Sequence, residues 1–177
     1  MNPQLEKDER FLDDRVAEEK AVAQFPPEIV DDLPGTISEE KWQNIYEKLM
    51  GLNTQQKVRL AQVANLPTRM LFIHSPIKLI SLAVLKNPKL TESEVLRYSQ
   101  QKNLVEDVLV AIAKDPKWIK TYPIKLAIVS NPKTPLSISV NFLSHLREND
   151  LKALSRDKNI STVLSRAAQQ MLMKRSK

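Results

Sequence analysis

The fold of this chain is decided by an eight-residue stretch, Leu-Ala-Val-Leu-Lys-Asn-Pro-Lys at 82–89, which returns as Leu-Ala-Ile-Val-Ser-Asn-Pro-Lys at 126–133. The two copies lie 44 residues apart, within the range of about 40 to 47 residues typical of helical repeats. Two further pairs of matching segments are 76–79 with 123–126 and 111–115 with 153–157. Their offsets of 47 and 42 residues make the repeat imperfect. Such a repeat predicts how the chain builds a core, and says little about what its surface binds.

Helical periodicity and end signals predict short helices along the chain and no sustained strand. Ser38 is expected to cap a helix over 38–50, and Thr91 with Glu94 has the form of a capping box. Thr134 is expected to cap the helix that begins with Pro135. Eleven prolines with only two glycines fit short helices joined by stiff turns. We therefore predict an all-α fold, a right-handed α-solenoid of short HEAT-like helical repeats.

Charge is divided unevenly along the chain. Residues 1–50 carry 6 Lys and Arg against 13 Asp and Glu, a net charge of −7, whereas residues 51–177 carry 21 against 8, a net charge of +13. We predict an acidic, partly flexible N-terminal arm over 1–35 and a helical-repeat domain over 36–177. The arm is expected to fold back on the basic body, to serve a different partner, or to be simply a solvated tail.

The composition argues against several classes of function. The chain has no cysteine, so it has no disulfide and no thiolate metal site. Its two glycines form no phosphate-binding loop. No apolar run is long enough to span a membrane, and the N-terminus does not resemble a secretory signal, so a cytoplasmic protein without membrane insertion is expected.

Catalytic and metal-binding constellations are also not predicted. The two histidines, His74 and His145, are a full repeat apart, and a metal site would need more ligands at matched spacing. Neighbouring carboxylates such as Asp13 and Asp14 point about 100° apart on a helix, so they do not converge on one substrate. We therefore expect a non-enzyme with no catalytic residue, no metal and no cofactor.

Asn-Pro turns give the chain a resemblance to known repeat families. Pairs of short helices joined by such turns resemble HEAT-type repeats and the leucine-rich-repeat-variant family of bacterial helical repeats, over roughly residues 54–172. In the second family Asn-Pro followed by Thr-Pro, as at 131–135, commonly separates a helix from the next short one. Asn65 lies 22 residues before Asn87, half the longer period. Because the chain lacks cysteine, the resemblance does not extend to the metal-cluster segment associated with that family.

Basic residues at the repeat junctions are the candidate partner-binding residues. Lys89, Lys117 and Lys133 each follow a proline, and stacked repeats place equivalent junctions along one edge. The remaining members of this predicted ridge are Lys86, Lys114, Lys120 and Arg156. The alternative is that lysines near helix C-termini complement the helix dipole, and that the asparagines are turn residues. Trp118 is expected either to anchor a partner from the surface or to seal the gap between two repeats.

These patterns favour a protein-interaction module, a scaffold or adaptor that binds a partner protein through its repeat surface. The alternative is an anion-binding protein that uses the basic ridge for nucleic acid or a phosphorylated nucleotide. A third, weaker hypothesis is self-association by end-to-end stacking of the repeats. The sequence predicts no particular oligomeric state.

Overall fold

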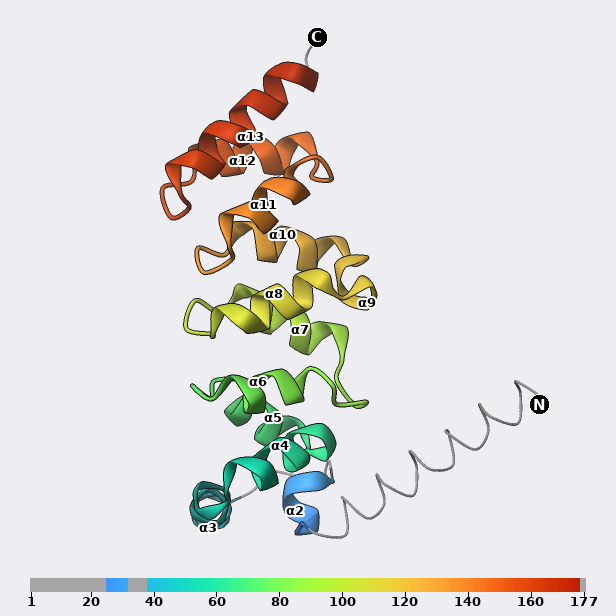
Figure 1. Ribbon diagram of the computed structural model, residues 1–177, viewed down its shortest axis with the longest axis vertical. Helices are drawn as coiled ribbons and strands as arrows, with labels where there is room; N and C mark the ends of the chain where they lie inside the picture. The colour runs from blue at the N-terminus through green and yellow to red at the C-terminus, as the bar shows by residue number, and fades with distance from the viewer. Residues whose placement is uncertain (1–24, 32–37, 176–177) are drawn as a thin grey trace, which may run out of the picture. The chain divides into compact units, whose positions relative to one another are not determined.

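The computed structural model describes residues 25–31 and 38–175 of the chain. These residues form twelve helices and no strand (Figure 1), which confirms the predicted all-α fold. They fall into two compact units, the first ending at Lys89 and the second starting at Leu90. The division falls inside the predicted repeat domain 36–177.

The described residues of unit 1 form five helices. They are α2 (Pro27–Val30), α3 (Glu39–Gly51), α4 (Thr54–Val63), α5 (Leu66–Phe72) and α6 (Lys78–Val84). Ser38 caps α3 as predicted, because its hydroxyl accepts the Lys41 amide at 3.5 Å. The next helix begins with a capping box, in which the side chains of Asn53 and Gln56 each accept the other residue's backbone amide at 2.9 Å. Helices α4 and α6 then pack on each other.

Helix α2 belongs to unit 1, although it lies within the predicted arm 1–35. Its residues Ile29 and Val30 are only 4% and 1% exposed. The backbone amide of Asn65 donates to the Ile29 carbonyl at 3.0 Å, and the Lys89 ammonium donates to the Val30 carbonyl at 3.1 Å. The remainder of the predicted arm, 1–24 and 32–35, lies outside the described residues.

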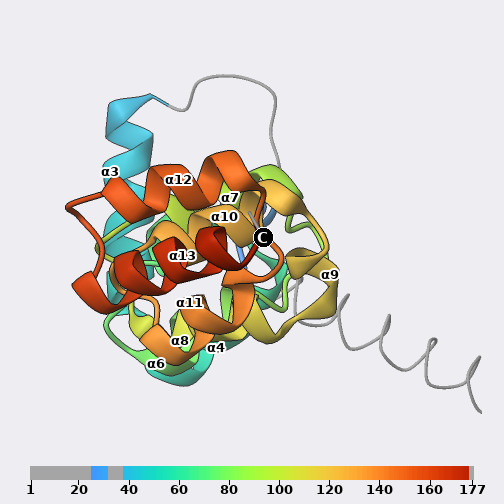
Figure 2. The same ribbon diagram turned by 90° about the horizontal axis from the view of Figure 1, so that it is seen from above.

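Unit 2 contains seven helices, six of which form two layers. They are α7 (Glu92–Gln100), α8 (Glu106–Lys114), α9 (Pro116–Ile119), α10 (Tyr122–Ser130), α11 (Leu136–Leu143), α12 (Glu148–Arg156) and α13 (Thr162–Arg175). One layer holds α7, α10 and α12, and the other holds α8, α11 and α13 (Figures 1 and 2). The predicted capping box starts α7, because the Thr91 amide donates to the Glu94 carboxylate at 3.1 Å and the Glu94 amide donates to the Thr91 hydroxyl at 3.4 Å.

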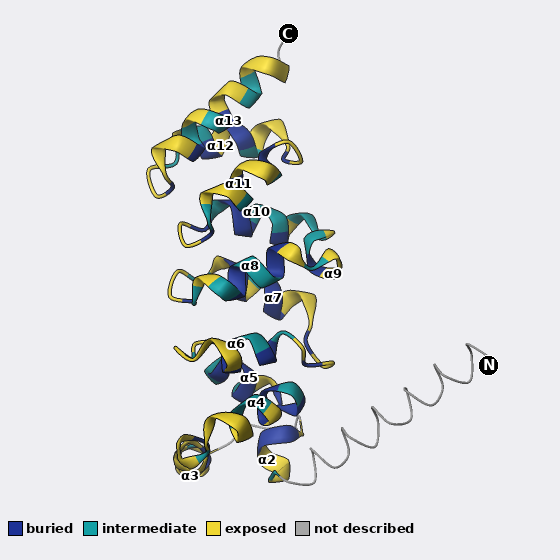
Figure 3. Ribbon diagram, viewed as in Figure 1, coloured by how far each residue is buried: buried dark blue, intermediate teal, exposed yellow. Residues whose placement is uncertain are grey.

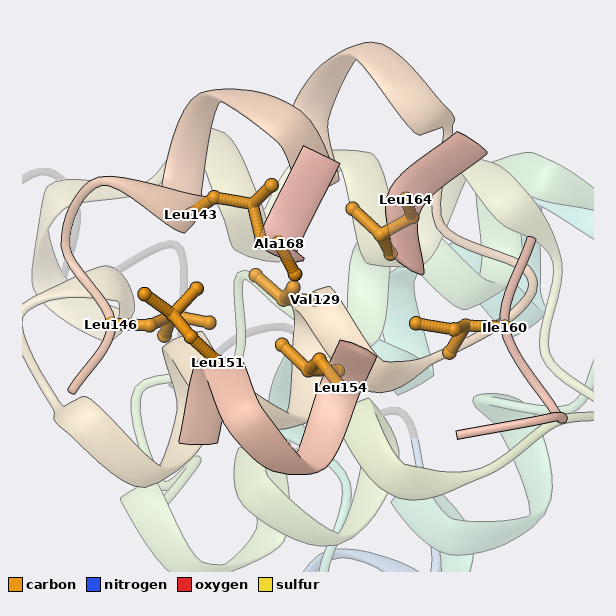
Figure 4. Close-up of a cluster of buried hydrophobic side chains, with 8 residues drawn as sticks. All are labelled: Val129, Leu143, Leu146, Leu151, Leu154, Ile160, Leu164 and Ala168. Carbon is orange, nitrogen blue, oxygen red and sulfur yellow. The ribbon is translucent and has the colours of Figure 1, made fainter. Parts of the chain in front are cut away.

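A cluster of aliphatic side chains joins the last four helices of unit 2 (Figure 4). Its members are Val129, Leu143, Leu146, Leu151, Leu154, Ile160, Leu164 and Ala168. They come from both layers or from the turns between them, and none is more than 8% exposed. Full burial of one such leucine contributes roughly 1.5–3 kcal/mol, so this cluster is a main source of stability for the end of the chain.

The prediction that Thr134 caps α11 is wrong. The N-cap position is Pro135, which has no side-chain donor or acceptor. The Thr134 amide instead donates to the Asn131 carbonyl at 3.0 Å, which closes the turn and leaves the Thr134 side chain 8% exposed. The turn geometry therefore overrides the local capping signal.

Candidate binding pocket

Asn131 joins the end of α10 to the end of α7 through its side chain. Its amide nitrogen donates both hydrogens, one to the Ser99 carbonyl and one to the Gln101 carbonyl, each at 2.8 Å. Its amide oxygen accepts the Lys133 backbone amide at 2.9 Å. Carbonyls at a helix C-terminus lack hydrogen-bond donors within the helix, and the Asn131 side chain provides the donors at the end of α7. The residue is 5% exposed, so it is a buried connection between two helices as well as a turn residue.

The same arrangement occurs twice in unit 1. The side-chain nitrogen of Asn87 donates to the Ala61 and Ala64 carbonyls, each at 3.0 Å, and so joins the end of α6 to the end of α4. The side-chain nitrogen of Asn65 donates to two carbonyls at the end of α2, at 2.8 and 3.1 Å. Both asparagines are 3% exposed. Both units therefore use one device to fix the spacing of neighbouring helices.

Tyr122 joins the start of α10 to the start of α12. Its hydroxyl accepts the Arg147 backbone amide at 2.9 Å and donates to the Asp150 carboxylate. The Arg147 guanidinium lies 4.5 Å from the centre of the tyrosine ring. Burial, followed by the hydrogen bond to Asp150, raises the pKa of the Tyr122 phenol above its ordinary value. Together with Asn131, this network anchors α10 at both ends to the two other helices of its layer.

A pocket of about 410 Å³ is lined by residues of α7, α10 and the turns that follow α7, α10 and α12. Five apolar side chains line it: Leu96, Pro123, Leu126, Ala127 and Pro132. The polar lining residues are Gln100, Lys102, Ser130, Asn131, Asp157 and Asn159. All eleven belong to unit 2, and we call this cavity the unit 2 pocket.

Helix α10 has almost no polar face, because neighbouring helices cover most of it. One side of the helix is in the core, where Ile124 and Ile128 are fully buried. Val129 belongs to the aliphatic cluster of Figure 4, and Leu126 packs against that cluster. Pro123, Leu126 and Ala127 also line the pocket, and of these three only Pro123 is exposed. In Figure 3 the helix is largely dark blue and teal, the colours of buried and intermediate residues. A helix that is apolar nearly all round is normally covered on several sides, and α10 packs on α7, α8, α9 and α11. Its exposed Pro123 and half-buried Leu126 are the apolar groups that it presents to the pocket.

The charged groups of the lining balance each other. Lys102 is its one cation and Asp157 its one anion. The carboxylate of Asp157 accepts the Asn159 backbone amide at 2.8 Å, which holds the turn after α12. Gln100 and Asn159 add carboxamides, which both donate and accept hydrogen bonds. This chemistry suits a ligand with apolar groups and peptide-like polar groups better than a polyanion, whose binding depends on several lysines or arginines.

The seven basic residues of the predicted ridge are all exposed, and none lines the pocket. Two of them, Lys86 and Lys89, belong to unit 1, and the other five belong to unit 2. Lys89 is engaged with the Val30 carbonyl, and the Lys117 ammonium lies 4.1 Å from the centre of the Trp118 ring. Two of the three junction lysines therefore make internal contacts.

Trp118 is 2% exposed. The alternative in which it anchors a partner from the surface is therefore wrong. Asp115 caps α9 by accepting the Lys117 amide at 2.8 Å, and this short helix places the indole in the interior of unit 2. Burial of so large a side chain agrees with the other alternative, in which Trp118 has a packing role.

None of the pocket residues was predicted from the sequence to be a binding residue. Two signals in the sequence point to them in retrospect. The first is the absence of a polar face on 122–130, which leaves one side of the helix without an assigned contact. The second is the asparagine that recurs at the end of a repeat, because a buried asparagine donates two hydrogens and needs two acceptors nearby.

No protein-family model, no curated protein and no solved structure matches this chain. Within residues 25–31 and 38–175, no helix has the length and apolar character needed to cross a membrane. Any assignment of function therefore depends on the pocket, the buried asparagines and the distribution of charge.

Proposed function

We propose that this chain is a non-enzymatic protein-interaction module, a cytoplasmic scaffold or adaptor that binds an extended segment of a partner protein in the unit 2 pocket. The observation that carries the proposal is the unit 2 pocket itself, which apolar residues of α7 and α10 line together with one cation and one anion. The volume of about 410 Å³ falls within the range of roughly 300–1,000 Å³ typical of ligand sites.

The proposal includes the repeat architecture expected from the sequence, a right-handed α-solenoid of HEAT-like or leucine-rich-repeat-variant units. The recurring asparagine supports it, because Asn65, Asn87 and Asn131 each join the end of one helix to the end of an earlier one. Repeat proteins of this kind bind partners on surfaces formed by successive units. A pocket lined by three elements of one layer is a surface of that type.

Selection of binding peptides from a random displayed library on the full chain tests this function. Ser130 lines the pocket, so the Ser130→Trp variant fills it, whereas Ser137→Trp makes the same change at an exposed position of α11. Selected peptides are expected to bind Ser130→Trp at least ten-fold more weakly than the wild type, and Ser137→Trp equally well. A second variant, Pro123→Glu, places a charge at an exposed apolar position of the lining. Undiminished binding to both pocket variants would contradict the proposal.

The alternative function, anion binding, is favoured by one feature of unit 2. Residues 116–147 contain five basic residues and no acidic one. They are Lys117, Lys120, Lys125, Lys133 and Arg147. Binding of a fluorescein-labelled oligonucleotide from low to physiological salt tests this function, because the slope reports the number of phosphates neutralised. If the anion function is correct, charge reversal at Lys117, Lys120 and Lys133 is expected to abolish oligonucleotide binding. If the peptide function is correct, the same change is expected to leave peptide binding intact.

We also propose that the acidic N-terminal segment competes for the basic body. Residues 1–50 carry a net charge of −7, of which residues 1–24 contribute −3 with 7 Asp and Glu against 4 Lys and Arg, and residues 51–177 carry +13. The test is a deletion that ends at residue 24, because Ile29 and Val30 are buried in unit 1 and their removal would disturb its fold. The truncated protein is expected to bind the labelled oligonucleotide more tightly than the full chain at low salt. Equal affinity and equal salt dependence would contradict this competition.

A further inference from the structure

The two charged residues of the unit 2 pocket come from different sides of α10. Lys102 follows α7, and Asp157 follows α12. Figures 1 and 2 show α10 between these two helices in their layer. The Asn131 bonds to the end of α7 and the Tyr122 bonds to the start of α12 agree with this order. The segments that carry the cation and the anion are therefore on opposite sides of α10.

The polar groups of the lining can hydrogen-bond a peptide backbone. Asn131 has used both amide hydrogens on the α7 carbonyls, so it has only acceptor capacity left. Gln100 and Asn159 carry carboxamides, which match both the N–H and the C=O groups of a bound chain. Asp157 accepts one backbone amide, and a carboxylate has about four acceptor positions in total, so it retains capacity for a cation.

We propose that the pocket selects an extended peptide segment in which one apolar side chain lies between an acidic residue and a basic residue. The apolar side chain contacts Leu96, Pro123 and Leu126, the acidic residue faces Lys102, and the basic residue faces Asp157. This inference rests on the proposed function and adds the charge pattern of the partner. Charge complementarity of this kind sets the register of a bound chain and suppresses wrong partners more than it raises affinity.

Binding of five labelled peptides to the full chain tests the charge pattern. Each peptide has nine residues, with a central triplet in a glycine–serine background. The triplets are Glu-Leu-Lys, Lys-Leu-Glu, Glu-Leu-Glu, Lys-Leu-Lys and Gln-Leu-Gln, and both mixed orders are needed because a peptide can bind in either direction. The better of the two mixed peptides is expected to bind roughly two- to five-fold more tightly than the neutral one for each exposed ion pair formed. Like-charge peptides are expected to bind more weakly than the mixed ones.

Two variants, each of which removes one charge, test the roles of Asp157 and Lys102 in peptide discrimination. Asp157→Asn keeps an acceptor for the Asn159 amide and removes the negative charge, so it is expected to lose discrimination against the Glu-Leu-Glu peptide. Lys102→Gln is expected to lose discrimination against the Lys-Leu-Lys peptide. Lys158→Gln is the matched control, because Lys158 is exposed next to Asp157 and does not line the pocket.

The outcomes separate this inference from the function on which it rests. If Ser130→Trp abolishes peptide binding while Asp157→Asn and Lys102→Gln keep the wild-type preferences, the charge pattern is overturned and the peptide-binding function stands. If Ser130→Trp binds all five peptides as the wild type does, both are overturned. Loss of discrimination in the two charge variants, with Lys158→Gln unchanged, supports the inference.

Discussion

Replacement of Asn131 by alanine removes the connection that holds the end of α10 against the end of α7. The change deletes two donated hydrogen bonds of 2.8 Å and one accepted bond of 2.9 Å. A protein hydrogen bond contributes a net of about 1 kcal/mol to stability, and a buried group left without a partner costs about 1–3 kcal/mol. Because Asn131 is 5% exposed, water replaces these partners poorly. We expect Asn131→Ala to lower the free energy of unfolding of unit 2 by about 3 kcal/mol.

Urea unfolding followed by tryptophan fluorescence measures this loss in unit 2. The chain has two tryptophans, Trp42 in α3 and Trp118 in unit 2, so a Trp42→Phe background leaves Trp118 as the reporter. The control is Asn103→Ala, because Asn103 is exposed and an exposed substitution normally changes stability by less than about 0.5 kcal/mol. If Asn131→Ala costs no more than Asn103→Ala, the side-chain connection does not stabilise α10.

Asn131→Asp gives a second test of the same contact. A carboxylate at this position faces two carbonyl oxygens and has no hydrogen to donate, so its protonated form is favoured in the folded state and its pKa is raised on folding. The folded variant therefore binds a proton more readily than the unfolded chain, and its deficit relative to the wild type is expected to shrink as the pH falls from 7 to 4. A deficit that grows over this range would contradict the geometry.

Three further predictions concern other contacts. Tyr122→Phe is expected to cost about 1–2 kcal/mol at pH 7 in urea unfolding. The folded pKa of Tyr122 is raised above 10.0, so this contribution is complete below pH 10 and is lost at higher pH, where the variant and the wild type are expected to converge. Trp118→Ala is expected to cost about 3–5 kcal/mol in urea unfolding followed by far-ultraviolet circular dichroism, because the side chain is buried; a cost below about 1 kcal/mol would contradict that burial. Lys89→Met removes the bond to the Val30 carbonyl, so the Asp31 amide at the end of α2 is expected to exchange its hydrogen two- to ten-fold faster; an unchanged rate would show that Lys89 does not hold α2.

Local features of the structure were predictable from the sequence. The capping box of Thr91 and Glu94 and the N-cap Ser38 depend on residues three positions apart, and both are present. The helical periodicity likewise predicts the all-α fold, because apolar residues that recur every 3.6 residues indicate an amphipathic α-helix. Thr134 shows the limit of such rules, since α11 begins one residue later than the Thr-Pro signal predicts and the buried Thr134 hydroxyl caps nothing.

The pocket and the contacts around it were not predictable in the same way. Asn131 finds its acceptors 30 and 32 residues earlier, and Tyr122 finds Asp150 28 residues later. The pocket itself combines segments near 96–102, 123–132 and 157–159, which the repeat pattern does not place together without the register of the helices. For Trp118, a position beside lysines in a turn favours two opposite interpretations, and only the packing of α9 decides between them.

The most direct test of the central claim is hydrogen-exchange mass spectrometry of the full chain with a library-selected peptide. Binding in the unit 2 pocket is expected to slow amide exchange in the segments 96–102, 123–132 and 157–159, and the Ser130→Trp variant is expected to show no such protection. Protection of α11 or of unit 1 alone, or protection that persists in Ser130→Trp, would contradict the account.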